Sequence, residues 1–382
     1  MKIGIEAQRL FRKKKHGIEF VAIELIKNLQ VIDKKNQYFI FVKSDEDNTS
    51  IKETENFKIV EINACSYPIW EQFVLPYEVK RHNCDLLHCT SNTAPIYPKA
   101  PLIITIHDII YLEKSNFNII SNKGTNYQRF GNLYRRYIVP KIVNSAEKII
   151  TVSNFEKKRI NDFFNFSVDN EKVISIYNGV SEHFRKIEDK IELQRVRSKY
   201  NLPEEFILFL GNTDPKKNTI NVLKAFSDLI ENYHYHIKLV ILDYKKEQLS
   251  IQLNEIGKPS LIENIQLCGY VVNTDLPAIY NLSKLFLYPS LRESFGIPLL
   301  EAMRCGTPII TSNTSSMPEI AGDAAYLVNP SEHECICEAM YELLNNETFR
   351  NDLIIKGYKQ CGEFGWKKMA LNILDLYNKI QI

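Results

Sequence analysis

The sequence predicts an α/β protein with two doubly wound, Rossmann-like domains. Short β-branched runs alternate with helical patterns along the chain, which is typical of parallel strands joined by crossover helices. The chain has 382 residues, which is long enough for two domains of ordinary size. The alternation weakens over a polar stretch at about Ser181 to Lys190, so we expect the linker between the domains there.

The first series of runs predicts seven strands and four helices. Its candidate strands are Lys2–Glu6, Gln37–Lys43, Phe57–Ile62, Asp85–Cys89, Leu102–Ile106, Lys148–Val152 and Lys172–Ile176. Its candidate helices are Ile18–Val31, Pro68–His82, Lys123–Ser145 and Phe155–Phe164. Ser153 stands where a side chain can cap the last of these helices, and the pattern weakens after Asn178-Gly179.

The second series repeats the alternation. Its candidate strands are Phe206–Leu210, His236–Leu242, Ile265–Cys268, Leu285–Tyr288, Thr307–Thr311 and Ala325–Val328. Its candidate helices are Thr219–Asn232, Asp275–Leu282, Ile297–Arg304, Ser331–Leu344 and Trp366–Ile380. Two such domains in succession make a cleft at the carboxyl ends of their strands, where doubly wound sheets bind ligands.

The composition is that of an ordinary globular protein, with 45% apolar and 25% charged residues. No apolar run approaches the roughly twenty residues that span a bilayer, and the N-terminal M-K-I-G-I-E-A-Q indicates a strand rather than a signal peptide. The eight cysteines are scattered without C-x-x-C pairs, as expected of reduced thiols in the cytosol. We therefore expect a cytoplasmic protein.

The net charge of +2 gives no reason to expect a nucleic acid as partner. Residues 1–183 hold 26 Lys and Arg against 21 Asp and Glu, and the rest of the chain holds 22 against 25. A solvated surface explains so modest an asymmetry. The alternative is that the basic half meets an anionic membrane face or a phosphate-bearing acceptor.

Two carboxylates, Glu293 and Glu301, stand on either side of a short loop and the start of a helix. Pro298 suits the first turn of that helix, because the N–H group that proline lacks would have no partner there. Gly306 suits the position just past its end. Glutamates eight residues apart are often no more than solvated charges on a helix, but here they come with this punctuation and with the T-P-I-I-T strand that follows.

The loop before this helix is a candidate ligand site. The start of a helix carries partial positive charge and unpaired N–H donors, so it attracts phosphate groups and sugar oxygens. With a carboxylate on each side to accept hydroxyl groups, the arrangement suits a nucleotide-sugar. The backbone groups that would point at such a ligand are those of Ser294, Phe295, Gly296 and Ile297.

A second candidate loop, G-N-T-D-P-K-K-N, follows the first strand of the second series. Gly211 allows the chain to turn tightly beneath a ligand. Lys216 and Lys217 place positive charge beside the start of the next helix, opposite a diphosphate. The alternative is a solvated lysine pair in a loop.

The stretch from Tyr288 to Pro330 resembles the retaining glycosyltransferases of family 4, which have the GT-B fold. The resemblance covers about forty consecutive residues, including R-E-S-F-G-I-P-L-L-E and S-M-P-E-I-A-G-D-A-A-Y-L-V-N-P. It implies that Glu293 lies at the donor sugar and that Glu301 binds the ribose hydroxyls. The loop at Gly211 is similar to the family's G-x-x-x-P-[RK]-K-N loop, which implies that Lys217, and after it Lys216, clamp the donor phosphates. Asn212 stands where some relatives have an arginine.

The resemblance also adds two residues in the first domain. His107 ends an apolar strand, where a histidine by itself is more often structural. The family pattern implies that His107 contacts the donor sugar or the acceptor, and we expect Asp108 to orient it. Gly17 stands where family members have a glycine-rich loop that approaches the donor phosphates and acceptor, although only one glycine is present here and a simple turn explains it nearly as well.

Neither a metal nor another cofactor is expected. The pairs His82 and His88, and His234 and His236, lack the helical spacing and carboxylate partners of a catalytic metal site. No Asp-x-Asp pair falls at a strand end. Lysines and a helix N-terminus are the expected means of neutralising the phosphates.

The resemblance implies a retaining hexosyltransferase for synthesis of cell-surface polysaccharide such as O antigen or capsule. The donor would be a GDP-sugar or another nucleoside diphosphate sugar of a mannose- or rhamnose-like hexose, and the acceptor a saccharide, expected to be lipid-linked. We expect residues 1–184 to form the acceptor-side domain, with the helix from about 366 to 382 packing back on it. Residues 185–365 would form the donor-binding domain. Peripheral contact with the inner membrane face would use the first domain, whose helix at 123–145 is basic and aromatic.

Three other functions are open at this point. Nucleotide-sugar epimerases share the GT-B architecture, but they are not expected to combine this lysine loop with the P-E-I-A-G-D run. A NAD-dependent dehydrogenase predicts a G-x-G-x-x-G after an early strand, and the sequence has none. A binding module without catalysis would not need both glutamates and both lysines.

Overall fold

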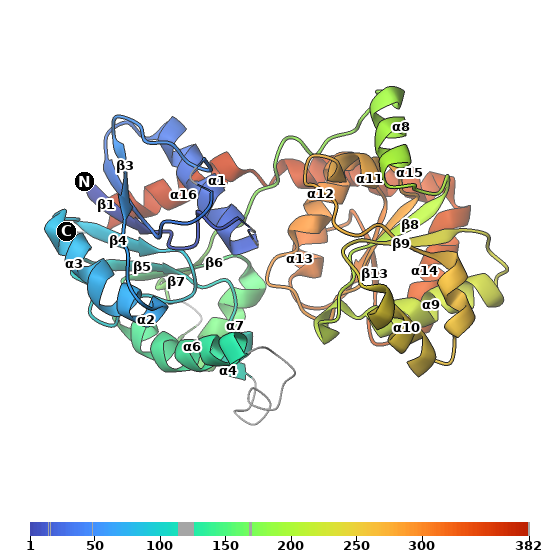
Figure 1. Cartoon of the computed structure of the whole chain (residues 1–382), viewed down its shortest axis with the longest axis horizontal. Helices are drawn as coiled ribbons and strands as arrows, with labels where there is room; N and C mark the ends of the chain where they lie inside the picture. The colour runs from blue at the N-terminus through green and yellow to red at the C-terminus, as the bar shows by residue number, and fades with distance from the viewer. Residues whose placement is uncertain (14, 16, 48, 114–125, 168–169, 381–382) are drawn as a thin grey trace. The chain divides into compact units, whose positions relative to one another are not determined.

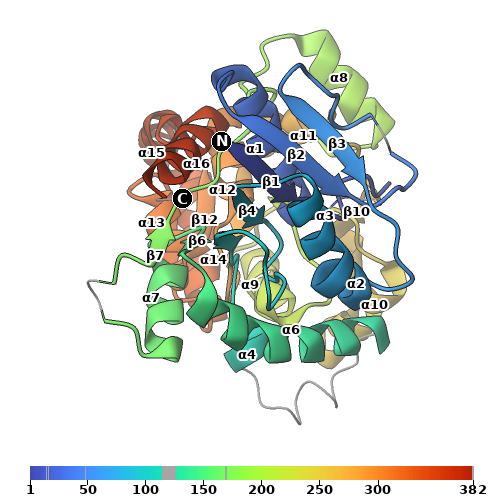
Figure 2. The same ribbon diagram turned by 90° about the vertical axis from the view of Figure 1, so that its left-hand side faces the viewer.

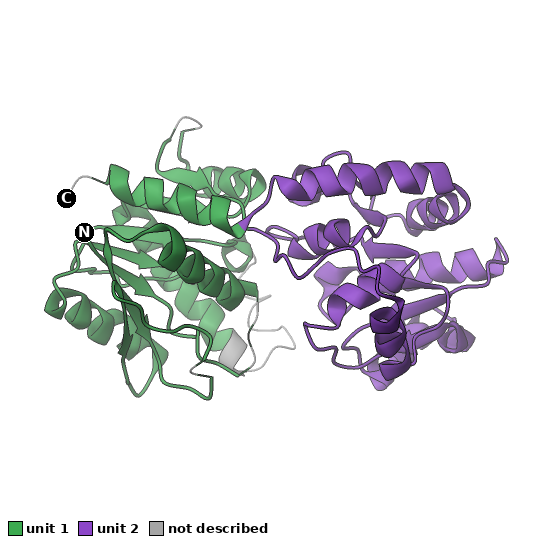
Figure 3. Cartoon of the chain, turned by 90° about the horizontal axis from the view of Figure 1, so that it is seen from above, with its two compact units in different colours: residues 1–178, 366–382 green, residues 179–365 purple. Residues whose placement is uncertain are grey.

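The computed structural model describes residues 1–382 except 14, 16, 48, 114–125, 168–169 and 381–382. It contains two compact units (Figure 3), residues 1–178 with 366–382 and residues 179–365. Each unit is an α/β layer structure with one parallel sheet (Figure 1). The division falls at the Asn178-Gly179 turn rather than after residue 184.

The first unit is built on a seven-stranded sheet of order β3-β2-β1-β4-β5-β6-β7. All neighbouring strands are parallel, and β1 lies between β2 and β4 with Ile3 opposite Leu86. The short runs of Ile, Leu, Phe and Val form strands because both faces of the sheet are covered by helices. The strands are β1 (Lys2–Glu6), β2 (Gln37–Val42), β3 (Phe57–Glu61), β4 (Leu86–Cys89), β5 (Leu102–Thr105), β6 (Lys148–Thr151) and β7 (Val173–Ser175).

Helices cover both faces of this sheet (Figure 2). On one face α1 packs against the last helix of the chain, α16. On the other, apolar residues of α3, α6 and α7 join the strands in one buried cluster that includes Val79, Ile142 and Ile160. The helices are α1 (Gly17–Ile32), α2 (Tyr67–Ile69), a π-helical turn (Trp70–Val74), α3 (Leu75–Arg81), α4 (Ile110–Glu113), α6 (Asn126–Ser145), α7 (Asn154–Phe164) and α16 (Trp366–Lys379).

Helix α16 returns the chain to the first unit and is anchored there by a buried histidine. Nδ1 of His88 lies 2.6 Å from the hydroxyl of Tyr377, and Nε2 lies 2.8 Å from the hydroxyl of Thr105. Burial lowers the pKa of His88 to about 3, so the ring stays neutral. His88 is thus a structural residue.

The second unit has a six-stranded parallel sheet of order β10-β9-β8-β11-β12-β13. The strands are β8 (Phe206–Phe209), β9 (Lys238–Ile241), β10 (Ile265–Leu267), β11 (Leu285–Tyr288), β12 (Ile309–Ser312) and β13 (Tyr326–Val328). The helices are α8 (Lys190–Lys199), a 3₁₀ turn (Pro215–Lys217), α9 (Thr219–Glu231), α10 (Lys246–Glu255), a 3₁₀ turn (Pro259–Asn264), α11 (Leu276–Leu282), α12 (Ile297–Cys305), α13 (Met317–Ala321), α14 (His333–Asn345) and α15 (Glu347–Gly362).

The structure corrects several predicted helices. The single helix expected over Pro68–His82 is broken by the π-helical turn. Residues 123–125 of the expected helix at 123–145 lie outside the described part of the chain, where α6 begins at Asn126. Helices α8, α10 and α15 were not predicted, because their sequences are polar and few of their side chains are buried. None of the helices in the described part of the chain has the length and apolar character needed to cross a membrane.

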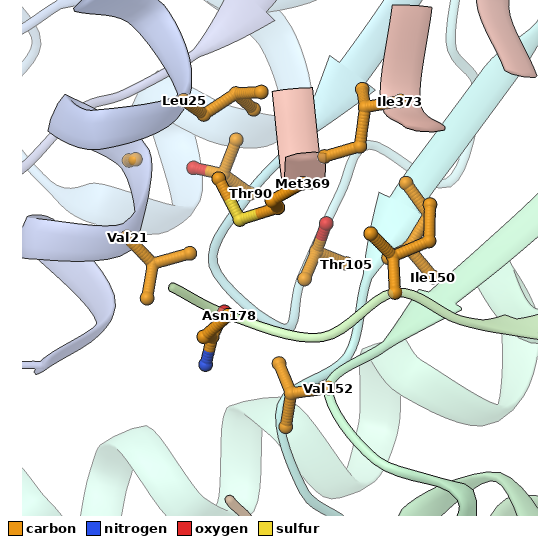
Figure 4. Close-up of a pocket in the computed structure, with 11 residues that line it drawn as sticks. Val21, Leu25, Thr90, Thr105, Ile150, Val152, Asn178, Met369 and Ile373 are labelled. Carbon is orange, nitrogen blue, oxygen red and sulfur yellow. The ribbon is translucent and has the colours of Figure 1, made fainter. Parts of the chain in front are cut away.

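A small cavity lies between α1, α16 and the sheet of the first unit (Figure 4). Its walls are mostly apolar, and its volume of about 20 Å³ is that of a single water molecule. The polar groups at its wall come from Thr90, Thr105 and Asn178. The cavity is too small for a sugar.

Candidate functional site

The two candidate loops of the second unit leave neighbouring strands of the sheet. Strands β8 and β11 pair directly, with Leu285 opposite Ile207, and the strand order reverses between them. At such a reversal the crossover connections leave toward opposite faces, so a crevice opens at the carboxyl ends of the two strands. The loop after β8 carries Lys217 and the loop after β11 carries Glu293. The topology therefore brings the two predicted motifs to one place.

The loop after β8 is shaped by Gly211 and fastened by Asn218. A Cβ atom on Gly211 would lie 2.3 Å from the ring of Phe209, so only glycine fits without a shift of that ring. Asn218 adopts a left-handed conformation (φ 60°) between the 3₁₀ turn and α9. Its side-chain amide donates to the carbonyl oxygens of Pro289 at 3.0 Å and Pro330 at 2.6 Å. These bonds join the loop to the segments that follow β11 and β13.

Lys217 points into the site. Its ammonium group donates to Oε1 of Glu293 at 2.5 Å and to the hydroxyl of Tyr288 at 3.0 Å. The two charged side chains are only 16% and 13% exposed, so their ion pair is poorly screened by solvent. Lys216 is 40% exposed and lies 3.8 Å from the carboxylate of Asp214. Of the two lysines, Lys217 is therefore the one that the fold directs toward Glu293.

The loop that carries Glu293 is held by two serines from the S-S-M-P-E run. Ser315 Oγ accepts from the Glu293 N–H at 3.0 Å and donates to the Glu293 carbonyl at 2.6 Å. Ser316 Oγ lies 3.0 Å from the carbonyl oxygens of both Glu293 and Phe295. Ser315 has a φ of 63°, a conformation that side chains rarely adopt, which shows how closely the surrounding structure determines this turn.

Helix α12 confirms the prediction made from its proline and glycines. It runs from Ile297 to Cys305 with Pro298 in its first turn. Gly296 precedes it with φ 100°, and Gly306 ends it with φ 71°, both values that favour glycine. The glycine at the N-terminus brings no capping side chain, and the first N–H groups of any helix have no carbonyl partner within it. An anion can take that place.

Glu301 lies on α12, with its carboxylate partly buried. The hydroxyl of Tyr280 donates to its Oε2 at 3.0 Å. Burial raises the pKa of Glu301 to about 7. Hydroxyl donors of a ligand would stabilise the ionised form of this carboxyl group. Each hydrogen bond that they donate replaces one that the carboxylate lost to water when it was buried.

Tyr288 is a site residue that the sequence did not single out. Its hydroxyl accepts from Lys217, whose ammonium group also lies 4.7 Å from the ring centroid. Burial raises the pKa of Tyr288 well above its usual range, and the charges of Glu293 and Glu301 raise it further. Tyr288 therefore interacts electrostatically with both predicted carboxylates. The available signal was its position as the last residue of the predicted strand Leu285–Tyr288.

His107 and Gly17 belong to the first unit. His107 is buried, and its Nε2 lies 3.0 Å from the carbonyl oxygen of Thr90. A carbonyl only accepts, so this bond places the ring proton on Nε2 and leaves Nδ1 as an acceptor. Burial lowers the pKa of His107. Gly17 is the exposed first residue of α1, and an added Cβ would meet nothing within 4 Å. The fold of the first unit itself gives no steric reason for a glycine there.

Asp108, the residue expected to orient His107, acts on that ring through its charge, which opposes the lowering of the His107 pKa by burial. The carboxylate of Asp108 also accepts from the backbone N–H of Ile110 at 3.2 Å, and the Thr90 carbonyl accepts from the ring of His107. Within the described residues, His, Cys, Asp and Glu side chains form no group of three or more that could hold a metal ion.

Two doubly wound parallel sheets define the class of the protein as GT-B, as the sequence predicted. A crystal structure of a glycosyltransferase from Rickettsia africae ESF-5 is similar to this chain with a TM-score of 0.75. The match covers 99% of this chain and 98% of that chain at 18% identity, so it demonstrates the fold.

Two family models match the chain, one in each unit. The model described as Glycosyltransferase Family 4 matches residues 16–184, and the model described as Glycosyl transferases group 1 matches residues 190–360. Together they leave only the two ends of the chain and residues 185–189 unmatched. The chain therefore belongs to the family 4 glycosyltransferases.

Two proteins from Escherichia coli are among the relatives that this chain resembles in sequence. The O-antigen chain mannosyltransferase B is 28% identical over 236 residues, which are 62% of this chain and 61% of the relative. The serotype-specific mannosyltransferase WbdA is 33% identical over 254 residues, which are 65% of this chain and 31% of the relative. The chain thus matches less than two thirds of the length of either relative.

Proposed function

We propose that this protein is a retaining glycosyltransferase that moves a mannose-like hexose from a nucleoside diphosphate sugar to a saccharide acceptor. The observation that carries the proposal is the convergence of Lys217, Glu293, Tyr288 and the N-terminus of α12 at one strand reversal. Together they offer a cation, oriented N–H groups and a carboxylate to a ligand with a diphosphate and a sugar.

The leaving group in this reaction is the nucleoside diphosphate. Lys217 and the N–H groups from Ser294 to Ile297 would stabilise the charge that develops on it, and Lys216 would add a second, more exposed cation. Preorganised donors of this kind usually make the largest contribution to catalysis. No metal is required when the protein supplies this positive charge.

The carboxylates would bind the hydroxyl groups of the donor. Glu293, next to the phosphate-facing lysine, is suited to the sugar at the reacting centre. Glu301, farther along α12, is suited to the ribose. His107, with Nδ1 left as an acceptor, is the candidate for a saccharide hydroxyl in the first unit. Retention of configuration is carried over from the family.

The names of the relatives favour mannose as the sugar and an O-antigen-type saccharide as the acceptor. A lipid-linked acceptor would bring the first unit close to a membrane. Helix α6 supports such contact, because Phe130 and Tyr137 are more than half exposed and Lys141 lies 3.4 Å from the ring centroid of Tyr137. Aromatic and basic side chains together suit the boundary between lipid and water.

A thermal-shift assay with GDP, UDP, dTDP and ADP tests the donor site. One nucleotide should raise the melting temperature of the wild type, and Lys217→Ala and Glu301→Ala should each lose that shift. Lys246→Ala removes an exposed lysine of α10 in the same unit and should keep it. If no nucleotide shifts the wild type, or if both site variants respond normally, the donor site is wrongly assigned.

A turnover assay separates the proposal from its alternatives. A transferase releases the nucleoside diphosphate only when an acceptor is present and forms a new glycosidic product. An epimerase would convert the nucleotide-sugar without an acceptor, and a binding module would convert nothing.

A further inference from the structure

The first unit has a strand reversal of its own. Strands β1 and β4 pair directly, and the strand order 3-2-1-4-5-6-7 reverses between them. In the second unit the corresponding reversal carries the proposed donor site. The same topological argument predicts a ligand site at the carboxyl ends of β1 and β4. Strand β1 ends at Glu6, and β4 is followed by Thr90 and Thr93.

Two buried carboxylates lie in this region, and one of them, Glu71, has both oxygens occupied. Its Oε1 accepts from the hydroxyls of Tyr67 and Thr93, each at 2.5 Å. Its Oε2 accepts from the side-chain amide of Gln72 at 2.8 Å and the hydroxyl of Tyr134 at 2.5 Å. Glu71 is therefore a supporting group that fixes the rings around it.

In the other carboxylate, Glu6, one oxygen accepts a hydrogen bond and the other has no partner within the described residues. It is 1% exposed, and its Oε1 accepts from the N–H of Gln8 at 3.0 Å. Its Oε2 has no hydrogen-bond partner among the residues that the structure describes. Buried polar atoms are nearly always paired, so such an atom needs an explanation. Burial and the charge of Glu71 raise the pKa of Glu6 to about 7.

Arg9 supplies an unused donor in the same turn. The turn after β1 is closed by a bond from the N–H of Leu10 to the carbonyl of Ala7 at 3.0 Å. The guanidinium group of Arg9 lies over the ring of Tyr67, 5.4 Å from its centroid, and its charge lowers the pKa of Glu6. Its buried Nε atom has no hydrogen-bond partner within the described part of the chain. Glu71 thus holds Tyr67, and Tyr67 supports Arg9.

We propose that Glu6 and Arg9 form a binding subsite for the hydroxyl groups of the acceptor saccharide. The Glu6 carboxyl would pair with one hydroxyl and Arg9 Nε would donate to a neighbouring one. Adjacent hydroxyls on a sugar ring offer this combination of donor and acceptor. Arg9 is partly exposed, so the ligand would enter beside it. The identity of the ligand as an acceptor rests on the proposed function.

The chemistry of the subsite favours a neutral ligand. Two carboxyl groups lie there against one guanidinium, so a phosphate would meet like charge. Tyr67 and Tyr134 add aromatic surface, with ring centroids 5.8 Å apart. The small cavity beside α1 lies on the other face of the sheet and cannot hold a sugar ring.

Saturation-transfer NMR with methyl α-mannopyranoside as the probe tests the subsite. The wild-type protein should bind it, and Glu6→Gln and Arg9→Ala should each weaken binding by about tenfold, as expected for loss of one hydrogen bond to a charged group. Arg81→Ala, which removes another arginine of the same unit, should bind normally. The partly exposed position of Arg9 keeps the test valid if Glu6→Gln fails to fold.

Lys217→Ala distinguishes failure of the subsite from failure of the proposed function. It should lose the nucleotide shift and keep the mannoside signal, whereas Glu6→Gln and Arg9→Ala should do the reverse. Absence of a mannoside signal with the wild type, or an unchanged signal with both subsite variants, would overturn the subsite. Absence of any nucleotide shift with the mannoside results intact would overturn the donor site alone.

Discussion

Lys217 has one charged and one neutral hydrogen-bond partner, and this arrangement suits a residue that binds a phosphate group. Glu293 accepts one hydrogen bond from the ammonium group, and Tyr288 accepts another without adding charge. A diphosphate that enters the site can share the ammonium group with both. The Tyr288 ring, buried at the end of β11, keeps the lysine chain from swinging away.

Replacing Tyr288 with Phe should weaken nucleoside diphosphate binding by roughly threefold to tenfold. The ring stays, but Lys217 loses one of its two orienting hydrogen bonds, which are worth about 1 kcal/mol each. Calorimetric titration measures the change, with the exposed Tyr270→Phe as the matched control. Unchanged affinity would show that Tyr288 has no part in holding the lysine.

Residue types at the site were predictable from the sequence, whereas their pairing was not. Lys217 and Glu293 are far apart in sequence and meet only because β8 and β11 are neighbours. The spare oxygen of Glu6 depends in the same way on the tertiary structure. In the sequence, Tyr288 cannot be told apart from a core residue at the end of a strand. Its hydrogen bond with Lys217 depends on the tertiary structure and has no sequence signal.

Glu301 should make the stability of the protein fall as the pH rises. Its pKa is raised to about 7 in the folded state from the ordinary 4.5 of a glutamate, so the protonated form favours folding. That contribution is complete below about pH 4.5 and is lost as the pH passes 7. Because the side chain is only partly buried, we expect about 1–2 kcal/mol.

Thermal unfolding at pH 5 and pH 8 measures this effect through the variant Glu301→Gln. The variant should gain melting temperature relative to the wild type on going from pH 5 to pH 8. Glu6, whose pKa is raised to about 7 as well, remains in both proteins and cancels in the comparison. A difference that is the same at both pH values would contradict the raised pKa.

At the scale of elements, helices whose ends are marked by proline, glycine or a capping side chain were predicted well. Pro298 and Gly306 gave the bounds of α12 to within a residue, and Ser153 caps α7 as expected, with Oγ accepting from the N–H of Glu156 at 3.2 Å. Helices α8, α10 and α15 lack such signals and bury only narrow stripes. The π-helical turn depends on tertiary contacts, among them the bond from Trp70 Nε1 to the Ile62 carbonyl at 3.0 Å.

Gly306→Ala should destabilise the second unit by about 1–2 kcal/mol or more. Its φ of 71° is unfavourable for alanine, and the new Cβ would lie 2.2 Å from the hydroxyl of Tyr358. Gly362→Ala is the matched control, because nothing lies within 4 Å of a Cβ there. Denaturant unfolding compares the two, and equal stabilities would argue against the left-handed helix end.

At the scale of the molecule, each unit is a doubly wound sheet with its own strand reversal, and the last helix completes the first unit. The two-domain α/β class was predictable because strand and helix patterns alternate twice along the chain. The sequence patterns alone do not reveal which strands lie side by side, and the sites depend on that order. Helix α16 also shows that residues near both ends of the chain build one unit.

Tyr377→Phe should loosen α16 and destabilise the first unit by about 1–2 kcal/mol, or roughly 3–6 °C in melting temperature. The change leaves Nδ1 of the buried His88 without its hydroxyl partner. Calorimetric melting measures the loss, with the exposed Tyr97→Phe as control. The nucleotide shift should persist, because α16 belongs to the first unit. A normal melting temperature would contradict the anchoring role of His88.

The most direct test of the donor site is acceptor-dependent release of GDP from GDP-mannose. The wild type should release GDP when a mannoside acceptor is added, and Lys217→Ala and Glu293→Gln should each be slower by about a hundredfold or more, as expected when a donor to the developing charge or its orienting partner is removed. GDP release that continues at the wild-type rate in both variants would contradict the assignment of these residues to the leaving group and the sugar.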